Sequence, residues 1–299
     1  MSQIAKIMNV AKETHTVIPA FNIPYIPMME PVVKALEEKR AFGLITVARL
    51  EWVKFSSGSP ETIAEEYRRV GNPLFTSLHL DHIPVIDEDH LKVDFMSDIS
   101  RAIKAGFSSV MVDGSRLSLD ENIKSVLEVV KLAHEADVPV EAELGAVMGH
   151  ESAGIPDYDE LFESGKGFTD VRDAQRFVNE TGLDWLSVAI GSVHGAITAS
   201  ARKQKKVTAR LNIEHLQKLD EALQIPLVLH GGSGVDLSYL EKSFQHGIAK
   251  LNIATDIRQP YEALKDVSVK KAQDDVYETM LKIIDKLQIE GSAEILLRG

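Results

Sequence analysis

The stretch 73-PLFTSLHLDH-82 ends an apolar run with three titratable side chains, His79, Asp81 and His82. Apolar runs of this length predict a buried strand, and titratable groups at the end of such a strand lie where active sites usually form. Side chains alternate along a strand, so His79 and Asp81 should point to one face and His82 to the other. We therefore expect Asp81 and His82 to converge on one site only where the chain bends out of the strand.

Seven further apolar segments accompany this stretch, and helical patterns separate them. The segments expected as strands are 17–22, 42–48, 73–82, 108–113, 138–144, 185–190, 226–230 and 248–253. Eight strands alternating with helices, without a linker or a break in composition, predict an α/β fold: a (β/α)8 TIM barrel forming a single domain over residues 1–299. A doubly wound sheet is the structural alternative, but such a sheet rarely needs eight units in order.

Two regions connect less regularly to this pattern. Residues 49–69 are polar, and a helix is predicted only in their second half, where Pro60 opens a good helix start. After the eighth strand, helices from Pro260 to Leu287 and a short tail are expected as a C-terminal helical extension.

Composition narrows the class of protein. The formal net charge of −12 argues against a nucleic-acid-binding or anionic membrane-binding surface. The chain has no cysteine, so any metal must be held by histidines and carboxylates, a ligand set that suits zinc, cobalt, manganese or iron. The first residues are too polar for a secretory signal, and no apolar run approaches a membrane span. A cytoplasmic enzyme acting on small molecules is the expectation.

Chemistry-bearing residues gather where the predicted strands end, and active sites of such barrels lie at that end. The side chains expected there are Asp81, His82, Asp113, Glu143, His194, His230 and Asn252. Three neutral imidazoles with one open position are a usual set of ligands for a catalytic zinc, so we predict a metal site at His82, His194 and His230. The alternative is that each histidine merely satisfies a polar group in the barrel.

Glycines after the sixth and seventh strands suggest an anion site. Gly195 and the turn 231-GGSG-234, with Gly231, Gly232 and Ser233, would leave backbone N–H groups open to a phosphate, and Asn252 and Thr255 would add donors. A plain tight turn is the other interpretation.

Two carboxylates are candidates for acid–base work. We expect that Asp81 cannot easily share a metal with the adjacent His82, which leaves it free for proton transfer. Glu151 lies in a long loop containing glycines, where it could close over a substrate or be a solvated loop charge; the residues alone do not decide between these.

Five motifs in this order resemble the class II, metal-dependent ketose-bisphosphate aldolases, the fructose- and tagatose-bisphosphate aldolase family. The motifs are 79-HLDH-82, 140-VEAELG-145, 189-AIGSVHG-195, 230-HGGSG-234 and 250-KLNIAT-255, and the resemblance runs from Pro19 to about Ile257. It implies reversible cleavage of a ketose phosphate to dihydroxyacetone phosphate and an aldehyde. It also implies a Zn²⁺ cofactor, with a second divalent or a monovalent cation as a further candidate, and a homodimer or homotetramer.

The resemblance also implies roles for individual residues. His82, His194 and His230 match the catalytic metal ligands, and Asp113 and Glu143 match carboxylates that hold a second or displaced metal. Asp81 matches the residue that exchanges a proton with the C4 hydroxyl of the ketose, and Glu151 matches the loop glutamate that moves the proton on the enediolate carbon. The residues matching the pocket for dihydroxyacetone phosphate are Gly195, Gly231, Gly232, Ser233, Asn252 and Thr255.

The sequence departs from the family pattern around the phosphates. Where the family usually has a serine after strand two, this chain reads 46-TVAR-49, and Arg49 is a candidate for the missing contact. Ala254 is typical of the tagatose type, and the family's Asp-Pro-Arg segment for the second phosphate is replaced by 267-VSVKK-271. We therefore expect a monophosphate or a modified ketose phosphate to suit this chain better than it suits the family's usual members.

Two other functions compete with an aldolase. A metal-dependent epimerase or hydrolase on the same barrel would need a carboxylate or a carbamylated lysine that bridges two metals, and Lys250 lies inside a predicted strand. A non-catalytic sugar-phosphate-binding protein would be expected to lack Asp81 or one of the histidines, and all of them are present.

Overall fold

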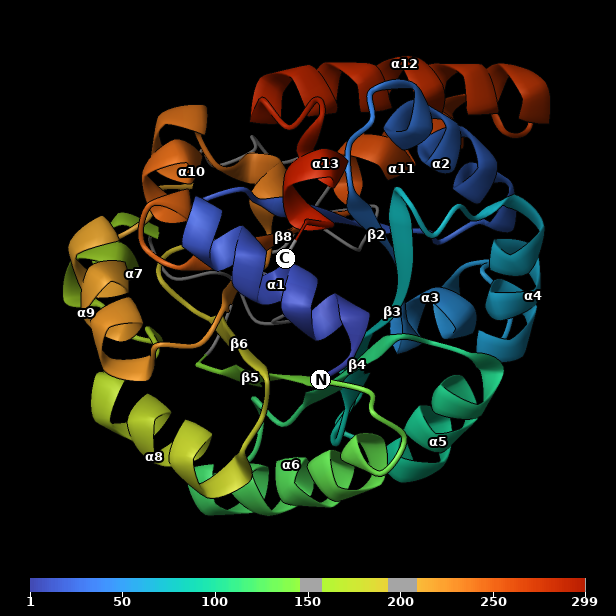
Figure 1. The fold of residues 1–299 in the computed structure, drawn as a ribbon. Coiled ribbons are helices and arrows are strands. Elements are labelled where there is room, and N and C mark those ends of the chain that lie inside the picture. Colours follow the sequence, from blue (N-terminus) through green and yellow to red (C-terminus); the bar gives the residue numbers. More distant parts are fainter. Residues whose placement is uncertain (146–157, 193–208, 299) are drawn as a thin grey trace.

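A computed structural model describes residues 1–145, 158–192 and 209–298 of the chain. Its eight parallel strands form a closed barrel in sequence order, in which β1 pairs with both β2 and β8 (Figure 1). Helices surround the barrel, which confirms the predicted (β/α)8 TIM fold. The strands are β1 Ile18–Asn22, β2 Gly43–Ala48, β3 Thr76–Pro84, β4 Ser109–Asp113, β5 Val140–Leu144, β6 Trp185–Val188, β7 Leu227–Leu229 and β8 Ile248–Ile253.

The helices follow the amphipathic stretches between the strands. They are α1 Gln3–Thr14, η1 Ile26–Met28, α2 Met29–Glu38, α3 Arg49–Lys54, α4 Pro60–Val70, α5 Phe95–Ala105, α6 Leu119–His134, α7 Tyr158–Ser164, α8 Val171–Thr181, α9 Ile213–Leu223, η3 Gly232–Gly234, α10 Leu237–Phe244, α11 Thr255–Leu264, α12 Val269–Leu287 and α13 Ser292–Leu296. Side-chain caps fix several starts: in α6, Ser118 and Glu121 form a capping box, and Asp170 accepts from two N–H groups of α8. None of the helices in these described ranges is long and apolar enough to cross a membrane.

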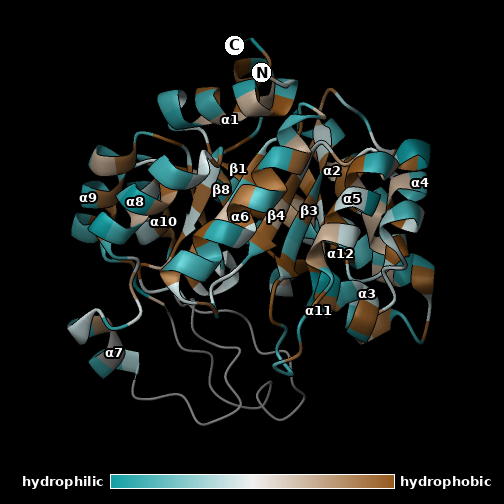
Figure 2. Cartoon of the chain, turned by 90° about the horizontal axis from the view of Figure 1, so that it is seen from below, coloured by the Kyte–Doolittle hydropathy of each residue, from teal (hydrophilic) through white to brown (hydrophobic). Residues whose placement is uncertain are grey.

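The two ends of the barrel are built differently. Ile4, Ile7 and Met8 of α1 pack with Phe42 and Trp185 in a cluster that closes the end where the strands begin. Figure 2 shows α1 at this end and α3 and α11 toward the other. Because apolar side chains fill the end where the strands begin, a site built from polar side chains is expected at the end where the strands finish.

The structure corrects three predicted boundaries. Strand β3 does not end at His82 but continues to Pro84. The first part of 49–69, expected to be irregular, forms helix α3. Helix α11 begins at Thr255 and contains Pro260, which the sequence suggested as a helix start because proline is favoured in a first turn.

Candidate metal centre and active site

Asp81 and His82 reach one site because β3 carries an extra residue. Pairing of β3 with β4 shifts between Leu80 and Ile83, and His82 has a φ of 30°. This bulge replaces the bend expected from the sequence. A positive φ at a residue other than glycine costs about 1–3 kcal/mol, so the surrounding structure must hold His82 in place.

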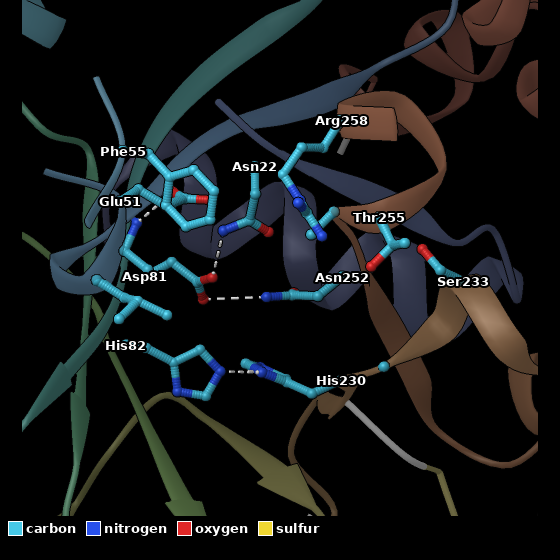
Figure 3. A pocket seen from close by; sticks show the side chains of 14 residues that line it. Asn22, Glu51, Phe55, Asp81, His82, His230, Ser233, Asn252, Thr255 and Arg258 are labelled. Atoms are coloured by element: carbon cyan, nitrogen blue, oxygen red, sulfur yellow. Dashed lines mark hydrogen bonds between the residues drawn. The ribbon is translucent and has the colours of Figure 1, made fainter. Parts of the chain in front are cut away.

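His82 and His230 present ring nitrogens to each other (Figure 3). His82 Nε2 lies 2.6 Å from His230 Nδ1, and the rings meet edge to face at an interplanar angle of 88°. Ligand atoms of Asp81, His82 and His230 all lie within 4.8 Å of one another. Convergent imidazole nitrogens beside a carboxylate are a donor set that fits a divalent transition metal.

A carboxylate holds the second nitrogen of each ring. His82 Nδ1 lies 3.1 Å from Asp113 Oδ2, and His230 Nε2 lies 2.9 Å from Glu141 Oε1. Carboxylates in this position fix the orientation of metal-binding histidines and raise their basicity. Asp113 therefore contacts His82 directly, and Glu143 completes a further group of possible ligands with these two residues.

Glu141, which sequence reasoning did not select, anchors the buried charges of the barrel. It is fully buried and accepts hydrogen bonds from Lys250 Nζ at 2.8 and 3.0 Å and from Trp185 Nε1 at 2.7 Å. His79 lies nearby, its Nε2 3.5 Å from a Glu141 oxygen. Lys250 is thus held in an ion pair inside the barrel. Glu141 stands two residues before Glu143 on the same face of β5, and that period of two could have identified it.

The charges of the site act on one another. Burial opposes a charge on His82, but the carboxylates of Asp81 and Asp113 outweigh it and raise the pKa of His82 to about 10. Burial and the neighbouring His82 lower the pKa of His230. Burial, followed by the charge of Asp113, raises the pKa of Glu143 to about 8. The two facing ring nitrogens therefore compete for one proton. A metal ion can take the place of that proton, because an imidazole nitrogen binds a metal in its unprotonated form.

Asp81 is held as a carboxylate by two amides. Its Oδ2 accepts from Asn22 Nδ2 at 2.8 Å, and its Oδ1 accepts from Asn252 Nδ2 at 3.0 Å. Burial opposes its charge, but His82 and Lys250 keep the pKa of Asp81 well below its usual range. The bulge brings Asp81 and His82, adjacent in sequence, to one site, and the expectation that Asp81 serves in proton transfer and does not share the metal stays a prediction.

The glycine turn after β7 lies at one end of the pocket that contains this site. Gly231, Ser233, Ala254 and Thr255 line that end, beside the start of α11. Gly232 does not line the pocket: it packs on β8, where an added Cβ would meet Leu251 Cδ1 at 2.5 Å. We call the four lining residues the glycine end.

The other end of the pocket is formed by residues that the sequence analysis did not select. Ala48, Glu51, Phe55 and Arg258 line it. Figure 3 shows Glu51 and Phe55 across the pocket from Ser233 and Thr255, with Arg258 between Phe55 and Thr255. We call these four residues the acidic end. Glu51 and Phe55 were missed because helix α3 was not expected.

Arg49, the predicted phosphate contact, does not line the pocket. Its guanidinium lies 3.5 Å from Asp98 and 3.7 Å from Asp87, both outside the pocket. These two carboxylates therefore hold the Arg49 guanidinium away from the pocket. Three other candidates, Glu151, His194 and Gly195, lie outside the described residues.

Comparisons with known proteins bear on the family of the chain. The sequence model of the family "Fructose-bisphosphate aldolase class-II" matches residues 2–293. A probable fructose-bisphosphate aldolase of Bacillus subtilis is 31% identical over 258 residues, which cover 85% of this chain and 81% of that protein.

Two crystal structures are also similar. The YdjI aldolase from Escherichia coli K12 has a TM-score of 0.73 and 27% identity, covering 97% of this chain and 98% of that one. A putative fructose-1,6-bisphosphate aldolase from Coccidioides immitis has a TM-score of 0.76 and 26% identity, covering 96% of each chain. These matches confirm the resemblance seen in the sequence: the chain belongs to the class II fructose-bisphosphate aldolase family and is an aldolase, a carbon–carbon lyase.

Proposed function

We propose that the protein is a zinc-dependent aldolase that reversibly cleaves a ketose phosphate to dihydroxyacetone phosphate and an aldehyde. The observation that carries this proposal is the convergence of Asp81, His82 and His230 within 4.8 Å, with a carboxylate behind each ring. A metal-binding pair beside an ionised carboxylate combines the two groups that a retro-aldol reaction needs: an electron sink and a base.

The metal would be held by His82 and His230, and by His194 from outside the described residues. When bound, it supplies a Lewis acid that stabilises the negative charge left by carbon–carbon cleavage. Asp113 and Glu143, which stand beside His82, are the proposed ligands of a second cation. Lys250 does not compete as a Schiff-base former, because both oxygens of Glu141 bind its Nζ.

The proton steps fall to two carboxylates. We assign to Asp81 removal of the proton from the C4 hydroxyl, because it is ionised and is oriented by Asn22 and Asn252. That hydroxyl oxygen becomes the carbonyl oxygen of the released aldehyde. Glu151 is proposed to return a proton to the enediolate carbon.

The phosphate of dihydroxyacetone phosphate is proposed to bind at the glycine end. The 10-residue helix α11 begins there, after β8, and η3 follows β7. Free N–H groups at a helix start favour an anion, and loops after strands seven and eight are a frequent phosphate site of this fold. Asn252, Gly232 behind the turn and Gly195 complete the proposed set.

Three wider proposals accompany this function. Residues 1–299 are proposed to act as one domain, since α12 packs on α2 and α11 and α13 packs on α1. A cytoplasmic homodimer or homotetramer acting on a small sugar phosphate, without nucleic acid or membrane as a partner, is proposed from the family and from the net charge of −12.

Metal removal tests this function. A chelator should lower the release of dihydroxyacetone phosphate from ketose phosphates by about 10²–10³-fold or more, because it removes the stabilisation of the developing negative charge. Added Zn²⁺ should restore the rate. Release would be followed by a coupled dehydrogenase assay, with Co²⁺ and Mn²⁺ compared at equal occupancy.

A variant distinguishes the loss of the metal from other effects of the chelator on the enzyme. His230→Ala should bind less zinc and stay inactive after zinc is added, whereas His134→Ala, at the exposed last residue of α6, should behave as wild type. Chelator-resistant cleavage by fully metal-free protein would refute the metal-dependent mechanism.

A further inference from the structure

The acidic end of the pocket stands where the aldehyde half of the substrate must extend. This placement rests on the proposed function, in which the phosphate of the dihydroxyacetone half lies at the glycine end and the cleaved bond lies beside Asp81. The remaining carbons then run toward Glu51 and Phe55, which lie across the pocket from Ser233 (Figure 3).

The Glu51 side chain is buried and held in a fixed position at this end. It is 7% exposed, and its Oε2 accepts a hydrogen bond from the Ala48 N–H at 2.8 Å, which fixes the carboxyl group at the start of α3. Burial, opposed by this hydrogen bond and reinforced by the charge of Asp81, raises the pKa of Glu51 to about 8. The group can therefore accept a hydrogen bond when ionised and also donate one when protonated, as a hydroxyl partner requires.

The cation at the acidic end, Arg258, is already paired with a carboxylate and is poorly placed to serve a second phosphate. Arg258 is the one lysine or arginine among the described residues that line the pocket, and its Nη1 donates to Glu262 at 2.9 and 3.0 Å. Its guanidinium also lies over the Phe55 ring, 5.5 Å from the centroid. The charges of Arg258 and Glu262 cancel, so these two groups together with Glu51 carry net negative charge when Glu51 is ionised and none when it is protonated. In neither state do they supply the positive charge that a second phosphate needs.

We propose that Glu51 is a specificity-determining residue that binds hydroxyl groups of an unphosphorylated aldehyde half and disfavours a second phosphate. The preferred substrate is then a ketose 1-phosphate, cleaved to dihydroxyacetone phosphate and a free hydroxyaldehyde. Phe55 and Ala48 provide the apolar surface against which the carbon chain of that aldehyde packs, while Glu51 fixes its orientation.

The test compares a ketose 1-phosphate with the 1,6-bisphosphate of the same sugar, in both the fructose and the tagatose series, on the zinc-loaded enzyme. We expect kcat/KM to favour the better 1-phosphate by about tenfold or more over its bisphosphate. The comparison is made above pH 8, where Glu51 is ionised: in E51Q the carbonyl oxygen of the amide can still accept from the Ala48 N–H, but the negative charge is gone, so the preference should shrink at least about fivefold.

E121Q is the matched control, because Glu121 has the same capping role on α6 and lies outside the pocket. It should leave the preference unchanged. Synthesis provides a measurement that needs no variant: wild-type enzyme should condense dihydroxyacetone phosphate with glyceraldehyde faster than with glyceraldehyde 3-phosphate.

The outcomes are distinct. Preference for the bisphosphate by the wild type, or a preference unchanged in folded E51Q, overturns the role of Glu51 while the aldolase function stands. If neither sugar is cleaved and dihydroxyacetone phosphate exchanges no proton with solvent, the proposed function fails and the role of Glu51 fails with it.

Discussion

Replacing Asp81 by asparagine should lower the rate of ketose phosphate cleavage by about 10²–10⁴-fold, the usual contribution of a general base. The amide has the same shape as the carboxyl group but cannot take the hydroxyl proton. Bound zinc should change little, because His82 and His230 remain. Cleavage would be measured as release of dihydroxyacetone phosphate, and zinc content by elemental analysis of the same samples.

A second readout separates loss of the base from loss of the site. Exchange of the carbon-bound proton of dihydroxyacetone phosphate with solvent does not involve the C4 hydroxyl, so Asp81→Asn should retain it. Asp98→Asn is the control, since Asp98 lies on α5 outside the pocket and contacts Arg49. Cleavage within tenfold of the wild type would contradict the role given to Asp81, and joint loss of exchange and zinc would show a collapsed site.

The largest effect on stability is expected at Lys250. Its ammonium group is fully buried, 2.8 Å from Glu141 Oε2 and 3.9 Å from Asp81 Oδ1. Lys250→Met leaves these buried carboxylates without their cation, which should cost about 3–5 kcal/mol of the free energy of unfolding. Chemical denaturation of metal-free protein, followed by circular dichroism and by tryptophan fluorescence, measures the change.

A double variant tests whether charge is the cause. Lys250→Met with Glu141→Gln removes both members of the pair, so it should be more stable than Lys250→Met alone. Lys218→Met is the comparison on the surface, where Lys218 pairs with Glu214 on the same helix, and it should change stability little. If the double variant is as unstable as the sum of the two single changes, the buried pair is not what stabilises the barrel.

Prediction from sequence succeeded where a single period governs the chain. The alternation of apolar strands with amphipathic helices identified all eight strands, and strand ends identified Asp81, His82, Asp113, Glu143 and His230, which the structure brings together. These features depend on the spacing of residues along the chain, which can be read from a single sequence.

The missed features depend on three-dimensional context. The bulge at His82 arises from how β3 pairs with β4, and the acidic end arises from a six-residue helix too short to show a period. Arg49 has the right charge, but Asp87 and Asp98, which are distant in sequence, bind it elsewhere. Such competition between charges cannot be read from one segment.

The bulge in β3 also bears on how a site of this kind can be gained or lost in evolution. Because one residue more than the neighbouring strand requires lies between Leu80 and Ile83, deletion of a single codon there would restore regular pairing. Since Asp81 and His82 are the two residues between Leu80 and Ile83, the deletion would remove one of them and restore the alternation of faces around the other. The site therefore depends on the number of residues in β3 as much as on their identity. One inserted or deleted codon could create or abolish the site while the rest of the barrel stays unchanged.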